Sequence, residues 1–450
     1  MPTKSLKQTA TRASRGRSRS HPAAKRNARQ NSLPTLRAQL IKYVDVILDM
    51  GLNLRPGQRL LIVNNLLNGV DLSLAPFVRL LTKAAYRRGA PFVDVIWGDP
   101  LLERVRLQNA PKDSLKQYPK WPAAARMEHV ETADAYLALR ADDPDLLSDI
   151  DPALVGDYLA AIREHTQPLM TYMSRNHSNW CVATVSAPAW AAKVLPGLPE
   201  AERVPRLWQL IFETCRLGAD DVVESWRRHV ADLGARKDFL NTKQYAWLSY
   251  SGPGTHLKVG LPPGHIWNGG QMTAENGVTF VPNLPTEEVF TLPHLARVEG
   301  EVAAMKPLVY SGNTIDGMRL TFAQGEVVKF AARKGEAILG QLLRSDDGSR
   351  RLGEVALVPH SSPVSRLGVT FHSTLFDENA ASHLAFGQAY RFTLKGAETL
   401  TDEEFAQHGG NSSKVHSDFM VGSARMDIDG IRDDGAAEPI MRSGEWAFRV

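Results

Sequence analysis

The stretch RLLIV at residues 59–63, followed by PFVDVIW at residues 91–97, decides how this chain begins to fold. Short apolar runs of this kind are typical of buried strands. Between them, Asp71 can cap a helix that runs to about Arg88, where Gly89 ends it. A strand, a helix and a second strand in this order build parallel sheets. We therefore predict an α/β fold for this part of the chain.

The same alternation continues on both sides of this unit. Helical spacing predicts a helix over residues 36–48, and later segments alternate between strands and helices. After residue 245, runs of β-branched and aromatic residues lie between Gly and Asn turns, and Asn268-Gly269-Gly270 favours a hairpin. We predict an α/β N-terminal domain with a mostly parallel sheet over residues 33–245. An α+β C-terminal domain with an antiparallel sheet should follow over residues 246–450.

Residues 1–32 form a separate basic arm that we expect to be disordered, because it has almost no large apolar side chains. Residues 1–36 contain nine Lys and Arg and no Asp or Glu, whereas the whole chain has a net charge of +4, so the remainder carries −5. An acidic body argues against nucleic acid as the main partner. The arm could be a solvated extension, an organellar targeting signal, or a tether to nucleic acid or an anionic surface.

The composition excludes several classes of protein. With 43% hydrophobic and 23% charged residues among 450, the chain is globular. Its two cysteines exclude a disulfide framework and a thiolate-only zinc site, and they favour a reducing, cytoplasmic location. No apolar stretch approaches the ~20 residues of a membrane-spanning helix. The absence of GxxxxGK[ST], GxGxxG, HExxH and GxSxG motifs argues against nucleotide hydrolases, nicotinamide enzymes, single-helix zinc proteases and α/β-hydrolases.

Acidic side chains in apolar surroundings are the first candidates for chemistry. In an extended segment, Glu287 and Glu288 would face opposite sides, so that one points into a site while the other supports it. Glu354 lies inside the apolar run LGEVALV (352–358), where a buried carboxylate is costly unless it is paired or bound to metal. Taken alone, each of these is more often an ordinary surface acid.

Two histidines add imidazoles to this set. His383 and Tyr390 would lie two turns apart on one face if residues 379–390 were helical. In a strand, His416 and Asp418 would project to the same face and could reach one metal or two adjacent metals. A lone His is more often structural. Jointly, three carboxylates and two imidazoles supply about the five ligands that a pair of divalent ions needs, with one carboxylate bridging.

At these residues the chain resembles the thermophilic aminopeptidase family of dinuclear metallopeptidases, which includes aminopeptidases S and T. The resemblance runs from about residue 35 to residue 450, and the order and number of its blocks make it specific. The most diagnostic blocks are NLPTEEVFT (283–291) and residues 374–387. Further blocks lie at residues 53–62, 179–180, 188–191, 252–255, 352–358, 416–422 and 442–446.

The resemblance implies a metal-dependent aminopeptidase of leucyl aminopeptidase type, which releases N-terminal residues from peptides through a water activated by two metals. The implied cofactors are two divalent metal ions, zinc or cobalt first, with manganese or magnesium as alternatives. The implied metal ligands, all in the C-terminal domain, are Glu288, Glu354, His383, His416 and Asp418. The choice of Glu288 over Glu287 rests on the resemblance alone. A homodimer with its site facing an enclosed cavity is also implied.

The resemblance further places Tyr390 at the site, where it or a metal ion would stabilise the oxyanion. Glu287 or Glu354 would act as the general base, and the sequence leaves that choice open. The chain departs from the family at His256, where Asp is usual, and in its basic arm. We expect altered loop contacts at His256 rather than lost activity.

Two other classes of function stay open at this stage. A two-metal hydrolase could cleave another bond, as an amidase or a phosphoesterase does, because two-metal sites serve several reactions. A non-enzymatic scaffold that binds peptides or nucleic acid is the second alternative. The presence of all five expected ligands argues against the scaffold.

Overall fold

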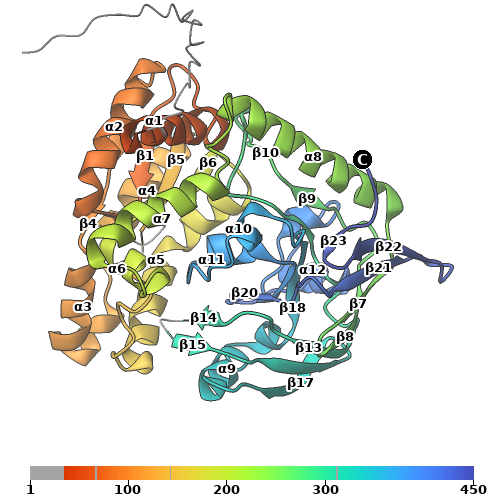
Figure 1. Ribbon diagram of the computed structural model, residues 1–450. Coiled ribbons are helices and arrows are strands. Elements are labelled where there is room, and N and C mark those ends of the chain that lie inside the picture. The colour runs from red at the N-terminus through yellow and green to blue at the C-terminus, as the bar shows by residue number, and fades with distance from the viewer. Residues whose placement is uncertain (1–34, 66–67, 142, 311–312) are drawn as a thin grey trace, which may run out of the picture.

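The computed structural model describes residues 35–65, 68–141, 143–310 and 313–450, so that the predicted basic arm lies outside the described residues. The chain folds into two parts that lie side by side (Figure 1). The N-terminal half contains a parallel sheet with helices, and the C-terminal half contains antiparallel sheets. This arrangement confirms the predicted order of an α/β part and an antiparallel part.

The N-terminal half is built on a four-stranded parallel sheet in the order β3-β1-β5-β6. All residues of the inner strand β1 (Leu60–Val63) are buried, and it pairs with β3 (Val93–Val95) and β5 (Ala135–Arg140). β6 (Trp180–Thr184) completes the sheet. An unbroken apolar run suits a strand covered on both faces. The strand–helix–strand unit predicted over residues 59–97 is therefore confirmed.

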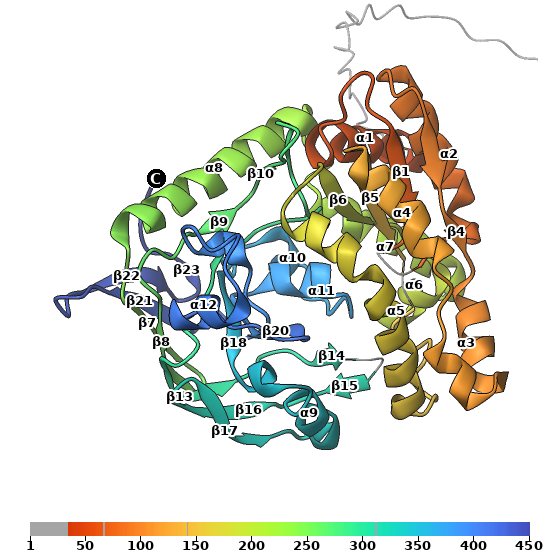
Figure 2. The same cartoon turned by 180° about the vertical axis from the view of Figure 1, so that it is seen from behind.

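Helices cover both faces of this sheet (Figure 2). Leu60 and Ile62 belong to the core formed with α1, α2 and α7, whereas Leu61 and Val63 pack with α4 and α5. No described helix is long and apolar enough to cross a membrane. The helices of this half are α1 (Leu36–Val46), α2 (Ala75–Arg87), α3 (Pro100–Asn109), α4 (Trp121–Glu131), α5 (Pro152–Ser174), α6 (Pro188–Val194) and α7 (Glu200–Thr214).

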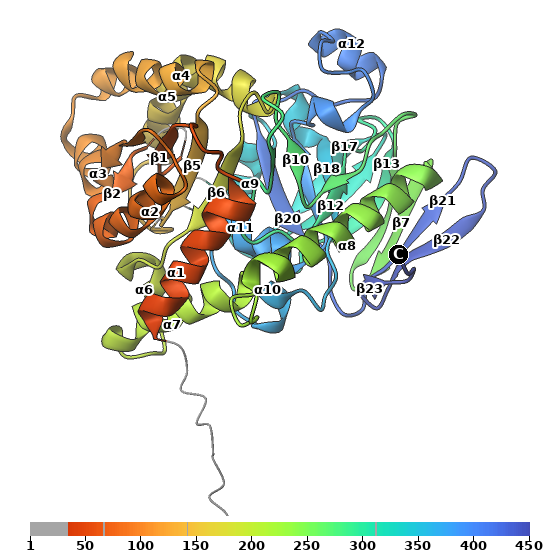
Figure 3. The same cartoon turned by 90° about the horizontal axis from the view of Figure 1, so that it is seen from above.

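The C-terminal half contains an eight-stranded sheet, β17-β16-β13-β8-β7-β21-β22-β23, and a five-stranded sheet, β20-β19-β18-β12-β9. Both contribute to one core, on which α8 (Val222–Lys243) packs (Figure 3). The larger sheet comprises β7 (Trp247–Gly252), β8 (Thr255–Gly260), β13 (Val298–Ala303), β16 (Arg319–Ala323), β17 (Glu326–Ala331), β21 (Asp427–Ile431), β22 (Ala437–Arg442) and β23 (Glu445–Trp446). The smaller comprises β9 (Asn268–Gly269), β12 (Val289–Thr291), β18 (Leu352–Leu357), β19 (His383–Gly387) and β20 (His416–Met420).

Two local predictions are wrong. Asn268 and Gly269 do not form a hairpin turn but the short strand β9, which pairs with β12. Residues 379–390 are not a helix, because residues 383–387 form β19, an inner strand of the five-stranded sheet. Strands on both sides of β19 satisfy its backbone, so tertiary pairing overrides the helical spacing of His383 and Tyr390.

His265 gives the fold a measurable pH dependence. Its side chain is buried, Nδ1 donates to the carbonyl of Pro262 at 3.0 Å, and Nε2 has no hydrogen-bond partner among the described residues. Burial lowers the pKa of His265 from 6.5 to about 4. The unfolded chain therefore binds this proton more readily than the folded chain. The contribution of neutral His265 to the free energy of unfolding is fully present above the unfolded pKa of 6.5. It falls by about 3 kcal/mol as the pH drops through the folded pKa of about 4.

We expect His265→Phe to remove this dependence, because phenylalanine does not titrate. In urea unfolding, the free energy of unfolding of the wild type should fall by roughly 3 kcal/mol more than that of the variant between about pH 7 and about pH 4. His408→Gln, at an exposed histidine, serves as the control and should retain the wild-type dependence. An equal fall in the wild type and His265→Phe would contradict the lowered pKa.

Candidate metal centre

The five-stranded sheet presents four of the five expected ligands on a single face. In an antiparallel sheet, residues directly opposite one another point to the same face. Ala385 of β19 lies opposite both Glu354 of β18 and Asp418 of β20. His383 and His416 are each two residues away from these positions on their own strands, so their side chains share this face. We call it the ligand face.

Glu288, the residue just before β12, joins the ligand face. Phe290 of β12 lies opposite Ala356, which is two residues from Glu354 and therefore shares its face. Glu288, two residues before Phe290, then faces the same way. The alternate residues of these strands enter the C-terminal core instead: Val289, Val355, Leu384 and Phe419. The strand alternation thus separates the polar ligands from the apolar core.

A β-bulge between Leu352 and Glu354 turns Glu354 onto the ligand face. Leu352 belongs to the core, although it is two residues from Glu354 and would otherwise share its face. Gly353 lies in the bulge, where a Cβ atom would be 2.3 Å from the carbonyl oxygen of Gly387. Only glycine allows this close approach of two backbones.

The ligand side chains converge into two groups of three that share Glu354. In the first group, Nε2 of His383 lies 3.2 Å from Oε2 of Glu288 and 3.4 Å from Oε1 of Glu354. In the second group, Nε2 of His416 lies 3.4 Å from Oδ1 of Asp418 and 3.9 Å from Oε2 of Glu354. Within each group the potential ligand atoms lie within 4.8 Å of one another. Glu354 therefore offers one oxygen to each group.

Backbone carbonyls fix the orientation of both imidazoles. Nδ1 of His383 lies 3.1 Å from the carbonyl oxygen of Ala381, and Nδ1 of His416 lies 2.8 Å from that of Gln388. A carbonyl only accepts hydrogen bonds, so each Nδ1 carries a hydrogen and each neutral imidazole has its lone pair on Nε2. This is the arrangement of metal-binding histidines, whose second ring nitrogen is held by a hydrogen bond.

Burial and charge strongly perturb the titration of these groups. Burial lowers the pKa of His416, but its ion pair with Asp418 and the charge of Glu354 outweigh this effect and raise the pKa to about 9. Burial likewise lowers the pKa of His383, but its ion pairs with Glu288 and Glu354 outweigh this effect and raise the pKa well above the usual value. Burial raises the pKa of Glu354, against the pull of the two imidazoles. Each imidazole Nε2 thus lies where a positive charge is favoured.

The donor set fits divalent metal ions. Oε2 of Glu288 is buried and, apart from its ion pair with Nε2 of His383, has no hydrogen-bond partner among the described residues. Within the described ranges, the ion-pair partners of Glu288, Glu354 and Asp418 are histidines, not Lys or Arg. Buried carboxylates without a compensating cation are costly. Carboxylate oxygens with imidazole nitrogens are ligands that bind zinc, cobalt and manganese.

Tyr390 lies beside the second group. Its ring centroid is 5.1 Å from that of His416, and its ring stacks on Phe392. Burial, followed by the charges of Glu354 and Asp418, raises the pKa of Tyr390 well above 10. The hydroxyl therefore keeps its proton and can donate a hydrogen bond to an oxygen that gains negative charge.

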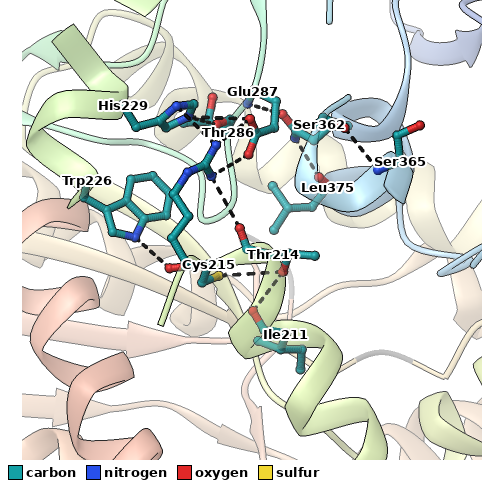
Figure 4. Close-up of polar contacts among 12 residues, drawn as sticks. Ile211, Thr214, Cys215, Trp226, His229, Thr286, Glu287, Ser362, Ser365 and Leu375 are labelled. Carbon is teal, nitrogen blue, oxygen red and sulfur yellow. Dashed lines mark hydrogen bonds and ion pairs between the residues drawn. The ribbon is translucent and has the colours of Figure 1, made fainter. Parts of the chain in front are cut away.

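The sequence also places Glu287 in the site. Its side chain faces the opposite way from that of Glu288 and therefore has different partners. Its carboxylate accepts hydrogen bonds from both terminal nitrogens of Arg216, at 2.5 and 2.8 Å. Neither group of potential metal ligands includes it. Figure 4 shows Glu287 beside His229 and Thr286. The structure therefore brings together all the other expected site residues and places Glu287 behind them.

Glu378 is a candidate that the sequence reasoning missed. It begins the 3₁₀ helix Glu378–Ala380, close enough to the ligand face for the charges of Glu288 and Asp418 to reinforce burial in raising its pKa well above the usual value. The adjacent Asp377 instead accepts hydrogen bonds from the backbone of Phe371 and Ser373. The sequence signal that could have identified Glu378 as a site residue is its position in the diagnostic block 374–387.

A cluster of buried carboxylates and imidazoles on one sheet face is typical of the class of metal-binding proteins. Comparison with known families then gives the particular one. Residues 36–446 match the family described as thermophilic metalloprotease (M29). The chain belongs to this family, which confirms the resemblance identified from the sequence.

Relatives and a solved structure agree with this assignment. The chain is 44% identical to aminopeptidase 2 of Geobacillus stearothermophilus, over 92% of this chain and 98% of the relative. It is 43% identical to aminopeptidase T of Thermus aquaticus, over 91% and 98%. The structure of wild-type AmpT from Thermus thermophilus superposes with a TM-score of 0.86 at 40% identity, covering 92% of this chain and 100% of that one. These similarities support the hydrolase class and the fold.

Proposed function

We propose that the chain is a metal-dependent aminopeptidase whose two groups of ligands hold two divalent ions. The observation that carries this proposal is the sharing of Glu354 between the two groups. Glu288 and His383 would complete the first site, and His416 and Asp418 the second. The family and the names of the relatives supply the reaction, cleavage of an N-terminal residue from a peptide.

When bound, two divalent ions lower the pKa of a water and polarise the carbonyl of the scissile bond. The residues around them divide the remaining work. Glu378 is suited to carry the proton from the water to the leaving amine, because it lies close enough to Glu288 and Asp418 to feel their charges and belongs to neither group of ligands. Tyr390 would donate to the oxyanion. Of the two bases left open by the sequence, both oxygens of Glu287 are taken by Arg216, and both oxygens of Glu354 face ligand groups.

Zinc or cobalt is the proposed ion, with manganese as the next choice. Two imidazoles among the five ligands favour these ions over magnesium, which prefers oxygen ligands and retained waters. The core of the C-terminal half lies behind the strands that carry the ligands. A substrate would therefore approach the ligand face from its other side, away from that core.

Three further expectations from the sequence belong to this proposal. The division near residue 245 into an α/β and a catalytic domain is supported by two hydrophobic cores, of which the first also takes in Leu284 and Phe376 and the second begins at Leu233. A cytoplasmic location is supported by the free thiols of Cys181 and Cys215. A homodimer is proposed from the family resemblance and is tested by light scattering.

The direct test is release of leucine from an unblocked leucyl anilide. Protein stripped by a chelator should be inactive, and the addition of Zn²⁺, Co²⁺, Mn²⁺ or Mg²⁺ in separate reactions should show which ion restores cleavage. The N-acetylated anilide is the matched control, because an aminopeptidase requires the free amine. Restored cleavage that is absent with the acetylated substrate supports the proposal.

Two outcomes would contradict it. Equal cleavage of both substrates would favour an amidase, and the absence of cleavage despite bound metal would move the reaction to another bond. A chain that retains neither metal nor activity would not be an enzyme of this kind.

A further inference from the structure

A buried ion pair lies directly behind the candidate metal ligands. Arg216 approaches from the turn between α7 and α8, and both of its terminal nitrogens donate to the carboxylate of Glu287. The side chain of Glu287 is only 3% exposed and that of Arg216 only 18%. A bidentate pair of this geometry fixes the orientation of the carboxylate as well as its charge.

His229 of α8 extends this contact to the backbone (Figure 4). Its Nδ1 lies 3.2 Å from Nη2 of Arg216, and its Nε2 lies 2.7 Å from the carbonyl oxygen of Thr286. Arginine only donates and a carbonyl only accepts, so Nδ1 of His229 is the acceptor and Nε2–H is the donor. We call Arg216, His229 and Glu287 the Glu287 clamp.

The same segment is held from a second direction. The backbone N–H of Glu287 donates to Oδ1 of Asn379 at 2.6 Å, and Nδ2 of Asn379 donates to the carbonyl of Leu375 at 2.7 Å. Asn379 directly follows Glu378. The peptide between Thr286 and Glu287 is thus bonded through its carbonyl to His229 of helix α8 and through its N–H to Asn379, in the segment that carries the proposed proton carrier. Glu288 is the next residue.

The clamp also has a rigid base in the N-terminal half. Nε1 of Trp226 donates to the carbonyl of Cys215 at 2.8 Å, and the guanidinium of Arg216 lies 5.6 Å from the centroid of the Trp226 ring. Both Cys215 and Trp226 belong to the core of the N-terminal half. Arg216 itself has a φ of +60°, which only a specific local structure maintains in a residue with a side chain.

From these contacts we infer that Arg216 and Glu287 are positioning residues, which set the backbone at residues 286–288 so that Glu288 presents its carboxylate to the first metal. The inference rests on the proposed two-metal function. It assigns Glu287 a role that differs from that of a general base. Because neighbouring residues in an extended segment face opposite sides, a restraint on Glu287 is transmitted to Glu288 through their shared peptide.

The test measures Zn²⁺ binding, with the full-length chain titrated against a competing fluorescent chelator and bound zinc counted after gel filtration. Arg216→Met should weaken one of the two zinc sites by roughly 10- to 100-fold, the usual effect of removing a group that orients a metal ligand. Arg216→Lys keeps the charge but not the two-pronged contact, so its affinity should lie between those of the wild type and Arg216→Met.

The double variant Arg216→Met/Glu287→Gln shows whether the two residues act on zinc affinity through their contact with each other. Arg216→Met alone leaves a buried carboxylate unpaired, and removing that charge as well should recover part of the lost affinity. Arg104→Met is the matched control, because Arg104 pairs in the same two-pronged way with Asp149 far from the cluster. Its zinc affinity should equal that of the wild type.

Kinetics with saturating metal separate positioning from acid–base catalysis. If Glu287 only positions Glu288, then excess ion should restore most of the kcat of Glu287→Gln. A variant that binds zinc normally but has lost kcat at every metal concentration would instead make Glu287 the base and overturn the inference. If Arg216→Met and Glu287→Gln both bound zinc as tightly as the wild type, the inference would also be overturned. If the wild-type chain bound no zinc, the proposed function would be overturned together with the inference.

Discussion

Glu354→Gln should lower kcat/KM for an unblocked leucyl anilide by at least about a thousandfold, equivalent to about 4 kcal/mol of lost transition-state stabilisation. Glu354 is the only one of the proposed ligands that belongs to both groups. Glutamine has nearly the same shape but carries no charge, and its NH₂ group is not a metal ligand. The substitution should therefore weaken both sites at once.

The measurement is steady-state kinetics together with the zinc content of the purified variant. We expect zinc to be lost from both groups, whereas His416→Ala should deplete mainly the second. Glu403→Gln, at an exposed carboxylate in α12 (Asp402–Gln407), is the control and should match the wild type. Two bound ions with full turnover in Glu354→Gln would contradict the bridging role.

Loss of folding would not explain this result. Burial raises the pKa of Glu354 in the metal-free chain, which means that its charge is unfavourable there. Replacing it by the neutral glutamine should leave the metal-stripped protein at least as stable as the stripped wild type. Thermal unfolding of the two stripped proteins, followed by circular dichroism, tests this expectation.

Glu378→Gln should lower kcat by about 10²- to 10⁴-fold, the usual contribution of a general acid–base group. Its carboxyl lies near Glu288 and Asp418 but belongs to neither group of ligands, so metal binding should persist. Glutamine cannot exchange a proton, and the loss should therefore appear in kcat rather than in KM. The variant is compared with the wild type at saturating metal, with bound metal counted in both.

The adjacent acid gives a matched comparison. Asp377 accepts hydrogen bonds from two backbone N–H groups and lies 3.9 Å from Nζ of Lys306, so its role is structural. Asp377→Asn should lower the free energy of unfolding by roughly 1–3 kcal/mol and leave kcat nearly unchanged. If Glu378→Gln kept the wild-type kcat, proton transfer would have to be assigned to another group.

At the candidate site, the sequence predicted which residues matter, and the structure shows how they are arranged. The residue types at Glu288, Glu354, His383, His416 and Asp418 were recognised from the sequence through their family blocks, and the structure brings them to one face. Their roles stay predictions that the variants above test. The helix expected around His383 is wrong, because spacing of seven residues fits a helix locally but says nothing about strands that pair with it from elsewhere.

Glu378 and Arg216 illustrate what local patterns cannot supply. Arg216 meets Glu287 across 71 residues of chain, and no periodicity connects them. Glu378 and Asp377 are adjacent acids, and their different roles depend on what surrounds each of them after folding. Both assignments depend on which segments become neighbours, and that is decided by the packing of the whole chain.

The sequence by itself determined the alternation of strands and helices in the N-terminal half, the antiparallel character of the C-terminal half, and the family. These follow from apolar periodicity and from short blocks, which act over a few residues. Only the tertiary structure decided the register that puts Glu354 and Asp418 on either side of Ala385, the bulge at Gly353, and the contact of Arg216 with Glu287. The physical reason is that register is fixed by burying one face of each strand against distant segments, and a shift of one residue in any of these strands would turn its ligands into the core.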